Sequence, residues 1–292
     1  MRAVVMALVA VAALAGGGAA QSLTDLNGLL DRVSERIAEY YRRAQNVICT
    51  EKSTVQPIGH SFSPEGFART VESELRIEPD AEDGDGSSDA KVVREIRKIN
   101  GRAPRERDKK DRSGCTDPNP LSPEPLAFLL PAHRSEYRFE RAYFGKGKEQ
   151  HTLIVDFTSA ESKRRSLDVV ESKKGIDDCY NMEGDVPEKG RIWIDPRTYQ
   201  VLKVERRMLG PVDLRVSREL QNRRRLADQM MLERYDTTIR YKIVEFHDPD
   251  ETLLLPESID MLIVHRGGFE STRRSQTFSD YRRFVTGARL VK

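Results

Sequence analysis

The sequence carries none of the short motifs that bring catalytic groups together. It has no Gly-x-Ser-x-Gly segment for a nucleophilic serine and no Gly-x-x-x-x-Gly-Lys-Ser/Thr segment for nucleotide phosphates. A triad or a carboxylate pair assembled from distant residues would leave no local motif, so a hydrolase stays open as an alternative. The histidines are scattered and form no His-Glu-x-x-His pair: His60, His133, His151, His247 and His265. We therefore expect no catalytic residue, no metal site and no cofactor.

Neighbouring arginines are the other candidates for chemistry, and they occur at 206–207, 223–225, 273–274 and 282–283. A row of arginines on one face of a sheet can hold phosphates or sulfates through bidentate contacts. Alternatively, they belong to solvated strand faces with Glu partners across the sheet, where their charge also discourages the addition of a further strand. The sequence favours this second interpretation. A net charge of +2 is too balanced for a dedicated nucleic-acid-binding protein.

One segment, GRIWIDPRTYQVLKVERRM at residues 190–208, holds an Asp, a Trp and several arginines close together. Asp195 followed by Pro196 is typical of the first two positions of a type I turn. The turn accounts for Asp195, so we assign it no catalytic role. The segment is predicted to be a β-hairpin that forms one wall of a sheet.

Alternation along the strands predicts which hairpin residues share a face. On the first arm, Ile192 and Ile194 point one way, while Trp193 points the other way and is half-exposed. On the second arm, Leu202 and Val204 share one face. The opposite face of that arm is expected to carry Val201, Lys203, Glu205 and Arg207.

The elements that must position these residues begin with an amphipathic helix, predicted in LTDLNGLLDRVSERIAEYYRRAQN. Thr24 or Asp25 can cap its N-terminus. Because an amphipathic helix must bury its apolar stripe, and because mostly strands follow, we expect it to pack on a sheet. The stripe at helical spacing contains Leu26, Leu30, Val33, Ile37, Tyr41 and Ala44.

Many later segments have the alternation or composition of strands. In GFARTVESELRIE, four apolar residues share one face, as in a half-buried antiparallel strand: Phe67, Val71, Leu75 and Ile77. No helix-length segments alternate with the strands, so a parallel sheet is disfavoured and the fold class is α+β, mainly β. The further strand segments are NVICTEKSTV, KVVREIRKING, YRFERAYF, HTLIVDF, RRSLDVV, TTIRYKIVEF, ESIDMLIVH and FESTRRSQTFSDYRRF.

Two stretches within the range 78–125 depart from this pattern. EPDAEDGDGSSD is acidic but has no Gly at the sixth position of a D-x-D-x-D frame, so we expect a solvated loop and no calcium site. GRAPRERDKKDRSGCTDPNPLSPEP is polar and Pro-rich, which predicts a long exposed connection. PEPLAFLLP closes it with an apolar helical turn before Pro131. We expect a single domain at 21–292 with a charged, partly disordered insert here.

The N-terminus has the pattern of a secretory signal peptide. Arg2 precedes an apolar run of 13 residues, Ala3 to Ala15, which is too short to span a bilayer comfortably. Gly18 and Ala20 then have the spacing that a signal peptidase recognises. We expect cleavage of residues 1–20, which places the mature protein in the periplasm or outside the cell without a membrane span. An uncleaved membrane anchor is the alternative.

Three cysteines, Cys49, Cys115 and Cys179, allow one disulfide and leave one thiol. An exported protein can keep a disulfide. Cys115 and Cys179 lie in polar, loop-like stretches, whereas Cys49 lies in an apolar strand segment, where it can be a small buried hydrophobe. We favour a bridge between Cys115 and Cys179, although the sequence alone does not determine the pairing.

The hairpin motif Gly-x-Ile-Trp-Ile-Asp-Pro-x-Thr, followed by the VLKVE strand, resembles the hairpin of the bacterial outer-membrane lipoprotein carrier family and its lipoprotein-sorting relatives. The order of RYKIVEF, LLLPESIDML and SDYRRF is also similar to a group of uncharacterised exported bacterial proteins. The resemblance covers residues 125–286 and the initial helix. It implies an antiparallel sheet curved into a half-barrel around the N-terminal amphipathic helix, with an apolar concave face that holds acyl chains in the carriers.

Three functions agree with these expectations. The first is a non-enzymatic periplasmic binding or carrier protein for a lipid, the acyl chains of a lipoprotein or another amphiphile. The second is an envelope protein that binds other envelope proteins through an exposed sheet face, and the third is the hydrolase named above. A carrier needs an apolar cavity, whereas an interaction protein needs an exposed patch. The candidate ligand contacts of a carrier are Ile192, Trp193, Ile194, Tyr137 and Phe139.

Overall fold

The computed structural model describes residues 25–79, 90–105, 125–160, 166–171, 180–184, 186–227, 229–247 and 250–283. The helical segments are α1 Leu26–Arg43, η1 Ala127–Leu129, α3 Pro131–Arg134, η2 Gly147–Glu149 and α4 Arg218–Arg224. The strands are β1 Val47–Ile58, β2 Arg69–Pro79, β3 Ala90–Ile99, β4 Tyr137–Phe144, β5 Leu153–Ser159, β6 Ser166–Glu171, β7 Tyr180–Glu183, β8 Glu188–Ile194, β9 Val201–Met208, β10 Val212–Val216, β11 Met230–His247, β12 Asp250–Arg266 and β13 Ser271–Arg283.

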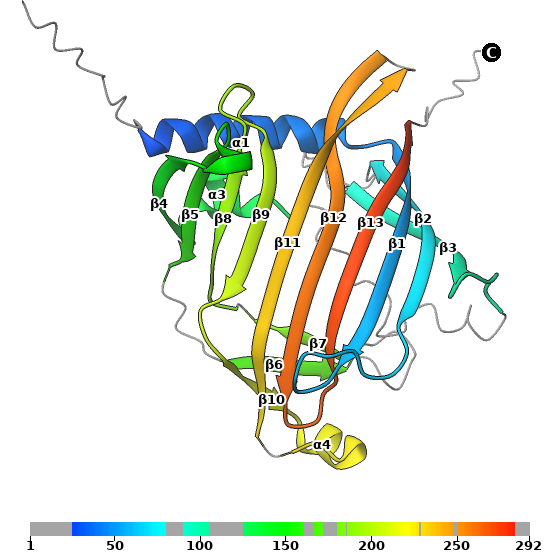
Figure 1. Cartoon of the computed structure of the whole chain (residues 1–292). Coiled ribbons are helices and arrows are strands. Elements are labelled where there is room, and N and C mark those ends of the chain that lie inside the picture. The colour runs from blue at the N-terminus through cyan, green and yellow to red at the C-terminus, as the bar shows by residue number, and fades with distance from the viewer. Residues whose placement is uncertain are drawn as a thin grey trace, which may run out of the picture.

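The described strands form one 13-stranded sheet (Figure 1). Its main path runs β3-β2-β1-β13-β12-β11-β9-β8-β5-β4, and β10, β6 and β7 continue from β11 off this path. Neighbouring strands are antiparallel, apart from the parallel pair β10–β6. A parallel pair needs a long connection, and here the chain passes through β7, β8 and β9 between β6 and β10. The expectation of a mainly antiparallel sheet is thus confirmed, with this one exception.

The sheet is open, because β3 and β4 stand at opposite ends of the strand order. It has the shape of a half-barrel with α1 against one face, and in the view of Figure 1 the helix runs behind the strands. We call the face that α1 covers the inner face and the opposite face the outer face. Leu30, Val33 and Ile37 of α1 pack with strand residues of the inner face, including Val155 and Ile192. The predicted fold class is confirmed.

The predicted stripe of α1 is confirmed at Leu30, Val33 and Ile37, each no more than 2% exposed. The proposed cap by Asp25 is wrong, because its side chain makes no capping hydrogen bond. Asp25 has a left-handed backbone with φ 37°, and its carbonyl oxygen instead accepts a hydrogen bond from the Leu29 amide at 3.0 Å. Thr24 lies outside the described residues.

The hairpin β8–β9 forms as predicted, but two assignments within it are wrong. Trp193 is 5% exposed, so it is buried and not half-exposed. Leu202 is not the core residue of the second arm, because a β-bulge pairs Trp193 with Lys203 and Ile194 with Val201. A bulge inserts one extra residue into a strand and thereby changes the alternation. Val201 therefore joins the inner core, where it is 3% exposed.

Phe67 also differs from its prediction, because it does not share a strand face with Val71. It is 96% exposed and precedes β2, which begins at Arg69. The pairing of β1 with β2 ends at Val55 and Arg69. In the loop that connects the two strands, Pro64 instead forms an isolated β-bridge with Ile58 at the end of β1. Phe67 thus lies in a loop and makes no contribution to the core.

The range 78–125 is only partly described, since 80–89 and 106–124 lie outside the described residues. Its central part is strand β3, which pairs with β2 along its length. The apolar segment after it forms η1, which ends at Leu129, and Pro131 opens the short helix α3. In the ranges that the structure describes, no helix has both the length and the apolar character needed to cross a membrane.

Candidate functional site

An apolar row crosses the inner face beneath α1. It contains one residue from each of five neighbouring strands, β5, β8, β9, β11 and β12, and strand pairing places these residues side by side. Every member is 2% exposed or less, because the helix and η1 cover the row. The row consists of Val155, Ile192, Val204, Ile239 and Ile259.

An aromatic cluster continues this surface toward β4. Phe157 on β5 lies 4.9 Å from Phe128 of η1 and 5.8 Å from Tyr137 of β4, measured between ring centroids. Phe139 pairs with Phe157 across the two strands, with centroids 6.3 Å apart. Gly190 on β8 makes room for this cluster, because a Cβ there would come within 2.6 Å of the Phe157 ring.

Four of the five ligand contacts predicted from sequence share the inner face: Tyr137, Phe139, Ile192 and Ile194. Trp193 does not join them. It pairs with Ile154 across the strands on the outer face, and the Lys203 ammonium lies 4.1 Å from its ring centroid. Such a cation–π contact over a buried ring stabilises the sheet from outside.

A second row crosses the inner face beside the apolar row, on the side away from Leu153 and Ile194. Strand pairing joins Gly190 to Arg206, Thr237, Met261, Arg274, Val55 and Arg69 in succession. This row contains three arginines, on β9, β13 and β2. Alternation sends their neighbours Arg207 and Arg273 outward, where both side chains are exposed.

Arg206 is fixed by two inner-face partners. Its Nε donates to both carboxylate oxygens of Glu188, at 2.9 and 3.0 Å, and its Nη2 donates to the Tyr137 hydroxyl at 3.1 Å. The Tyr137 hydroxyl in turn donates to Glu188 at 3.0 Å. Burial, together with the Glu188 charge, raises the pKa of Tyr137 to about 12. Burial acts to lower the pKa of Arg206, but Glu188 outweighs this and raises it, so the guanidinium stays charged.

A separate polar cluster lies between β1, β3 and β13. Glu51 is 1% exposed and accepts hydrogen bonds from Arg94 Nε at 2.6 Å and from Gln276 Nε2 at 3.0 Å. These bonds connect the end strand β3 to the middle of the sheet. Cys49, on the same strand face, is a free, buried thiol, and burial raises its pKa to about 12. It is a buried hydrophobe, as expected, and is not nucleophilic.

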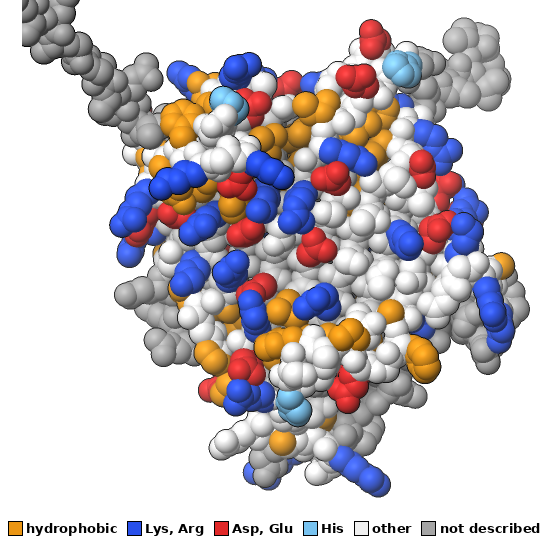
Figure 2. All heavy atoms as spheres, viewed as in Figure 1, with side chains coloured by type: hydrophobic (Ala, Val, Ile, Leu, Met, Phe, Trp, Pro, Cys, Tyr) orange, Lys and Arg blue, Asp and Glu red, His pale blue; other side chains and the backbone are white. Residues whose placement is uncertain are grey.

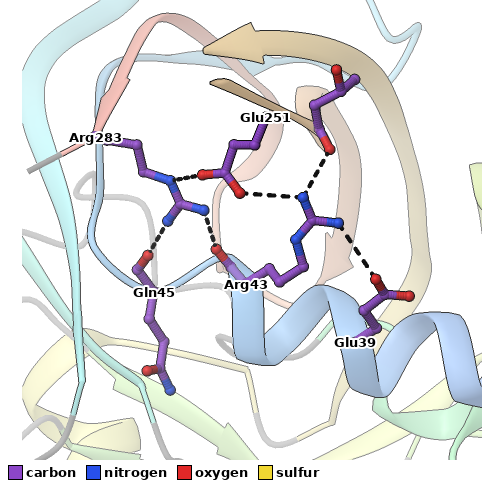
Figure 3. A network of polar contacts seen from close by, with 6 residues as sticks. Glu39, Arg43, Gln45, Glu251 and Arg283 are labelled. Atoms are coloured by element: carbon purple, nitrogen blue, oxygen red, sulfur yellow. Dashed lines mark hydrogen bonds and ion pairs between the residues drawn. The ribbon is translucent and has the colours of Figure 1, made fainter. Parts of the chain in front are cut away.

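The helix that covers the inner face is held at its C-terminal end by the network in Figure 3. The Arg283 guanidinium donates to the carboxylate of Glu251 and to the backbone carbonyls of Arg43 and Gln45. Arg43 Nη2 donates to the other Glu251 oxygen at 3.2 Å. The Arg43 carbonyl stands at the end of the helix, where backbone carbonyls lack helical partners, and Arg283 supplies its donor. Through these contacts Arg283 joins α1 to β12 and β13.

The outer face has a different character. In Figure 2, which looks onto this face, basic and acidic side chains are interspersed. Several form ion pairs along or across strands, such as Arg240–Asp260 at 3.0 Å and Lys98–Glu72 at 2.7 Å. Among the neighbouring arginines named from the sequence, Arg207 lies 3.9 Å from Glu205 and Arg282 lies 3.7 Å from Glu74, as the second interpretation predicts. Arg206 also has a glutamate partner, Glu188, on the inner face.

Sequence reasoning missed Glu51 and Glu188, and it named Arg206 only as one of the neighbouring arginines. The alternation of inward and outward residues along β1 could have predicted that Glu51 is buried. Glu51 falls on the same strand face as the buried residues Val47 and Cys49. Within the described residues, no group of three or more His, Cys, Asp or Glu side chains is placed to bind a metal ion. Cys115 and Cys179 both lie outside the described residues.

No family model matches this chain, and neither does any curated protein. Among solved structures, it is similar to a domain assigned to outer membrane lipoprotein sorting from Vibrio parahaemolyticus, with 12% identity, a TM-score of 0.37 and coverage of 88% of this chain and 93% of the other. It is also similar to a DUF1329 family protein from Desulfovibrio piger, with 11% identity, a TM-score of 0.40 and coverage of 89% and 94%.

A third similar structure is a LolA superfamily protein from Nitrosomonas europaea, with 9% identity, a TM-score of 0.31 and coverage of 87% of this chain and 94% of the other. The names of the first and third of these structures refer to the lipoprotein-sorting group that the hairpin motif resembles.

Proposed function

We propose that this protein is an exported, non-enzymatic binding or carrier protein for an amphiphile, such as a lipid or the acyl chains of a lipoprotein. The observation that supports this most directly is the inner face itself. Its apolar row of five aliphatic residues continues into the aromatic cluster around Phe157, and a row with three arginines runs beside both. Alkyl chains pack on such an apolar surface because their burial removes it from water.

Binding in this way requires the covering segments to move. The apolar row is almost fully buried beneath α1 and η1, so a ligand chain must replace contacts that Leu30, Val33 and Leu129 now make. Ser34 marks where the two covers are joined, since its hydroxyl donates to the Leu129 carbonyl at 2.6 Å and accepts from Arg134 at 2.6 Å. A ligand that binds only the opened state shifts the population toward that state.

Export belongs to the same proposal. Residues 1–20 have the signal-peptide pattern, and their removal would deliver the mature protein to the periplasm or the exterior. Intact mass spectrometry of protein expressed with its full sequence should find a mature form that begins near Gln21. A secreted or periplasmic form that retains residues 1–20 would show that the segment is an uncleaved anchor.

Titration with the fluorescent fatty acid cis-parinaric acid tests the carrier function. We expect saturable binding by the wild type and a loss of about tenfold in affinity, or about 1.4 kcal/mol, in Phe139→Ala. Arg138→Ala is the matched control, since Arg138 is the exposed neighbour on β4 and should leave binding unchanged. Native mass spectrometry of protein from a periplasmic extract should also detect co-purified lipid. A flat titration with the wild type would exclude the carrier function.

A further inference from the structure

Tyr241 places one polar group inside the apolar core of the inner face. On β11 it is the next inward residue after Ile239, which belongs to the apolar row. Its side chain is 7% exposed and packs in the core cluster that contains this row. The Tyr40 ring of α1 meets it edge-on, with ring centroids 6.4 Å apart and an interplanar angle of 88°. Tyr241 therefore lies where the helix covers the sheet.

The hydroxyl of Tyr241 differs from those of two neighbouring tyrosines. It is buried and has no hydrogen-bond partner in the part of the chain that the structure describes. The Tyr41 hydroxyl accepts a hydrogen bond from the Leu126 amide at 2.9 Å, and the Tyr281 hydroxyl donates to the Pro256 carbonyl at 2.5 Å. Of these three hydroxyls, that of Tyr241 is the one that a ligand can engage without breaking an existing hydrogen bond.

A buried hydroxyl without a partner costs free energy, because its hydrogen bonds to water are lost on folding. A phenylalanine would fill the same space without this cost. Burial also raises the pKa of Tyr241 well above its usual 10, and the phenols of Tyr40 and Tyr41 act in the same direction. The hydroxyl therefore stays protonated near neutral pH and can donate a hydrogen bond.

A single buried hydroxyl suits a neutral acceptor. A buried carboxylate or phosphate needs several donors or a countercharge to offset its desolvation, whereas one hydrogen bond satisfies a carbonyl oxygen. An amphiphile with esterified acyl chains has such a carbonyl at the head of each chain. With the carbonyl at Tyr241, the alkyl chain would run over Ile239 and the rest of the apolar row.

We propose that Tyr241 is the polar anchor of the acyl site, and that its hydroxyl donates to the ester carbonyl of a bound acyl chain. This inference rests on the proposed function and adds to it a residue that selects acyl esters over hydrocarbons. The movement of α1 that binding requires would also take the Tyr40 ring off Tyr241 and admit the ligand. Removal of the hydroxyl should then change stability and binding in opposite directions.

Thermal unfolding without ligand measures the cost of the unpaired hydroxyl. Tyr241→Phe should raise the melting temperature by about 2–4 °C, because it deletes a buried group that lacks a partner. Tyr281→Phe is the matched control and should lower the melting temperature, since it removes a hydroxyl from the same core that donates to Pro256. A fall for Tyr241→Phe as large as that for Tyr281→Phe would show that the Tyr241 hydroxyl already has a partner, and would overturn the inference.

Titration with the methyl ester of cis-parinaric acid and with diphenylhexatriene, a hydrocarbon without an acceptor, measures the anchor itself. Tyr241→Phe should lower the affinity for the ester by about fivefold and leave that for the hydrocarbon within about twofold, because only the ester loses a hydrogen bond. Tyr281→Phe should change neither affinity by more than about twofold, since its hydroxyl is already bonded within the protein.

The remaining results separate the anchor from the carrier function. Equal losses for ester and hydrocarbon in Tyr241→Phe, or no loss for either, would overturn the anchor and leave the carrier function standing. A greater loss for cis-parinaric acid than for its ester would assign Tyr241 to a carboxylate and overturn the assignment to an ester. A wild type that binds none of the three probes would exclude the carrier function, and the anchor with it.

Discussion

Glu51 is a carboxylate in the core of this protein, and its partners explain why it is tolerated there. Arg94 supplies two N–H donors, at 2.6 and 3.2 Å, and Gln276 supplies a third. A buried charge is costly unless it is paired and hydrogen-bonded, and here both conditions are met. At the same time the three residues connect β3, β1 and β13, so the polar contact specifies how the strands are ordered.

We expect Glu51→Ala to lower the free energy of unfolding by about 2–3 kcal/mol, because Arg94 and Gln276 would lose a charged acceptor. Urea denaturation followed by circular dichroism measures this loss. Glu72→Ala provides the control, since Glu72 pairs with Lys98 on the surface at 2.7 Å and should cost less than about 1 kcal/mol. Equal losses for the two variants would contradict a structural role of the buried pair.

The hairpin residues provide a second comparison. Ile192→Ala should cost about 2–5 kcal/mol, because it opens a cavity at a position with no exposed surface. Asp195→Ala should cost about 0.5–1.5 kcal/mol, because Asp195 Oδ1 accepts only turn hydrogen bonds, from the amides of Arg197 at 2.8 Å and Thr198 at 3.3 Å. Urea denaturation of each variant measures both losses. A larger loss for Asp195→Ala than for Ile192→Ala would contradict our assignment of Asp195 to the turn.

At the scale of elements, α1 is attached to the sheet by apolar packing along its length and by charged contacts at its end. Glu251 lies between the guanidinium groups of Arg283 and Arg43 (Figure 3). Burial acts to raise the pKa of Glu251, but the hydrogen bonds from Arg283 and Arg43 outweigh it and lower the pKa below the usual 4.5. The network therefore favours the ionised carboxylate and depends on pH.

A carboxyl with a lowered pKa in the folded state adds stability above its unfolded pKa and loses it as pH falls through the folded value. We thus expect hydrogen exchange to show that α1, from Leu26 to Arg43, loses protection as the pH is lowered from 5.5 through 4.5 and below. Glu251→Gln should have weaker protection at pH 5.5 and a flatter pH dependence. The same pH profile in wild type and variant would show that other groups cause the loss.

For the molecule as a whole, the cellular compartment determines whether the cysteines form a disulfide or stay as thiols. Cys49 is buried and its thiol pKa is about 12, so it should resist alkylation until the protein unfolds. Peptide mapping without reduction should find Cys115 joined to Cys179 and Cys49 as a free thiol. The native protein is treated with one alkylating reagent and, after denaturation, with a second one. Cys49 should carry only the second reagent. A bridge that contains Cys49 would overturn both the predicted pairing and the placement of β1.

Local patterns in the sequence determined the elements of this protein. Apolar residues at helical spacing located α1, alternation located the long strands, and Asp195 with Pro196 located a turn. Each of these signals depends on residues a few positions apart, where backbone geometry alone decides which side chains share a face. Even the inward position of Glu51 could be read in this way, from the alternation of Val47, Cys49 and Glu51.

Only the tertiary structure decided which face is inner and which residues meet there. A bulge beside Trp193 brought Val201 into the core, and the position of α1 put Trp193 on the outer face. Arg206 contacts Glu188 and Tyr137 because the sheet brings β9, β8 and β4 close together. Along the chain, Tyr137 and Arg206 are 69 residues apart. Alternation is local, whereas strand order, bulges and helix packing depend on distant contacts, which no short segment of the sequence contains.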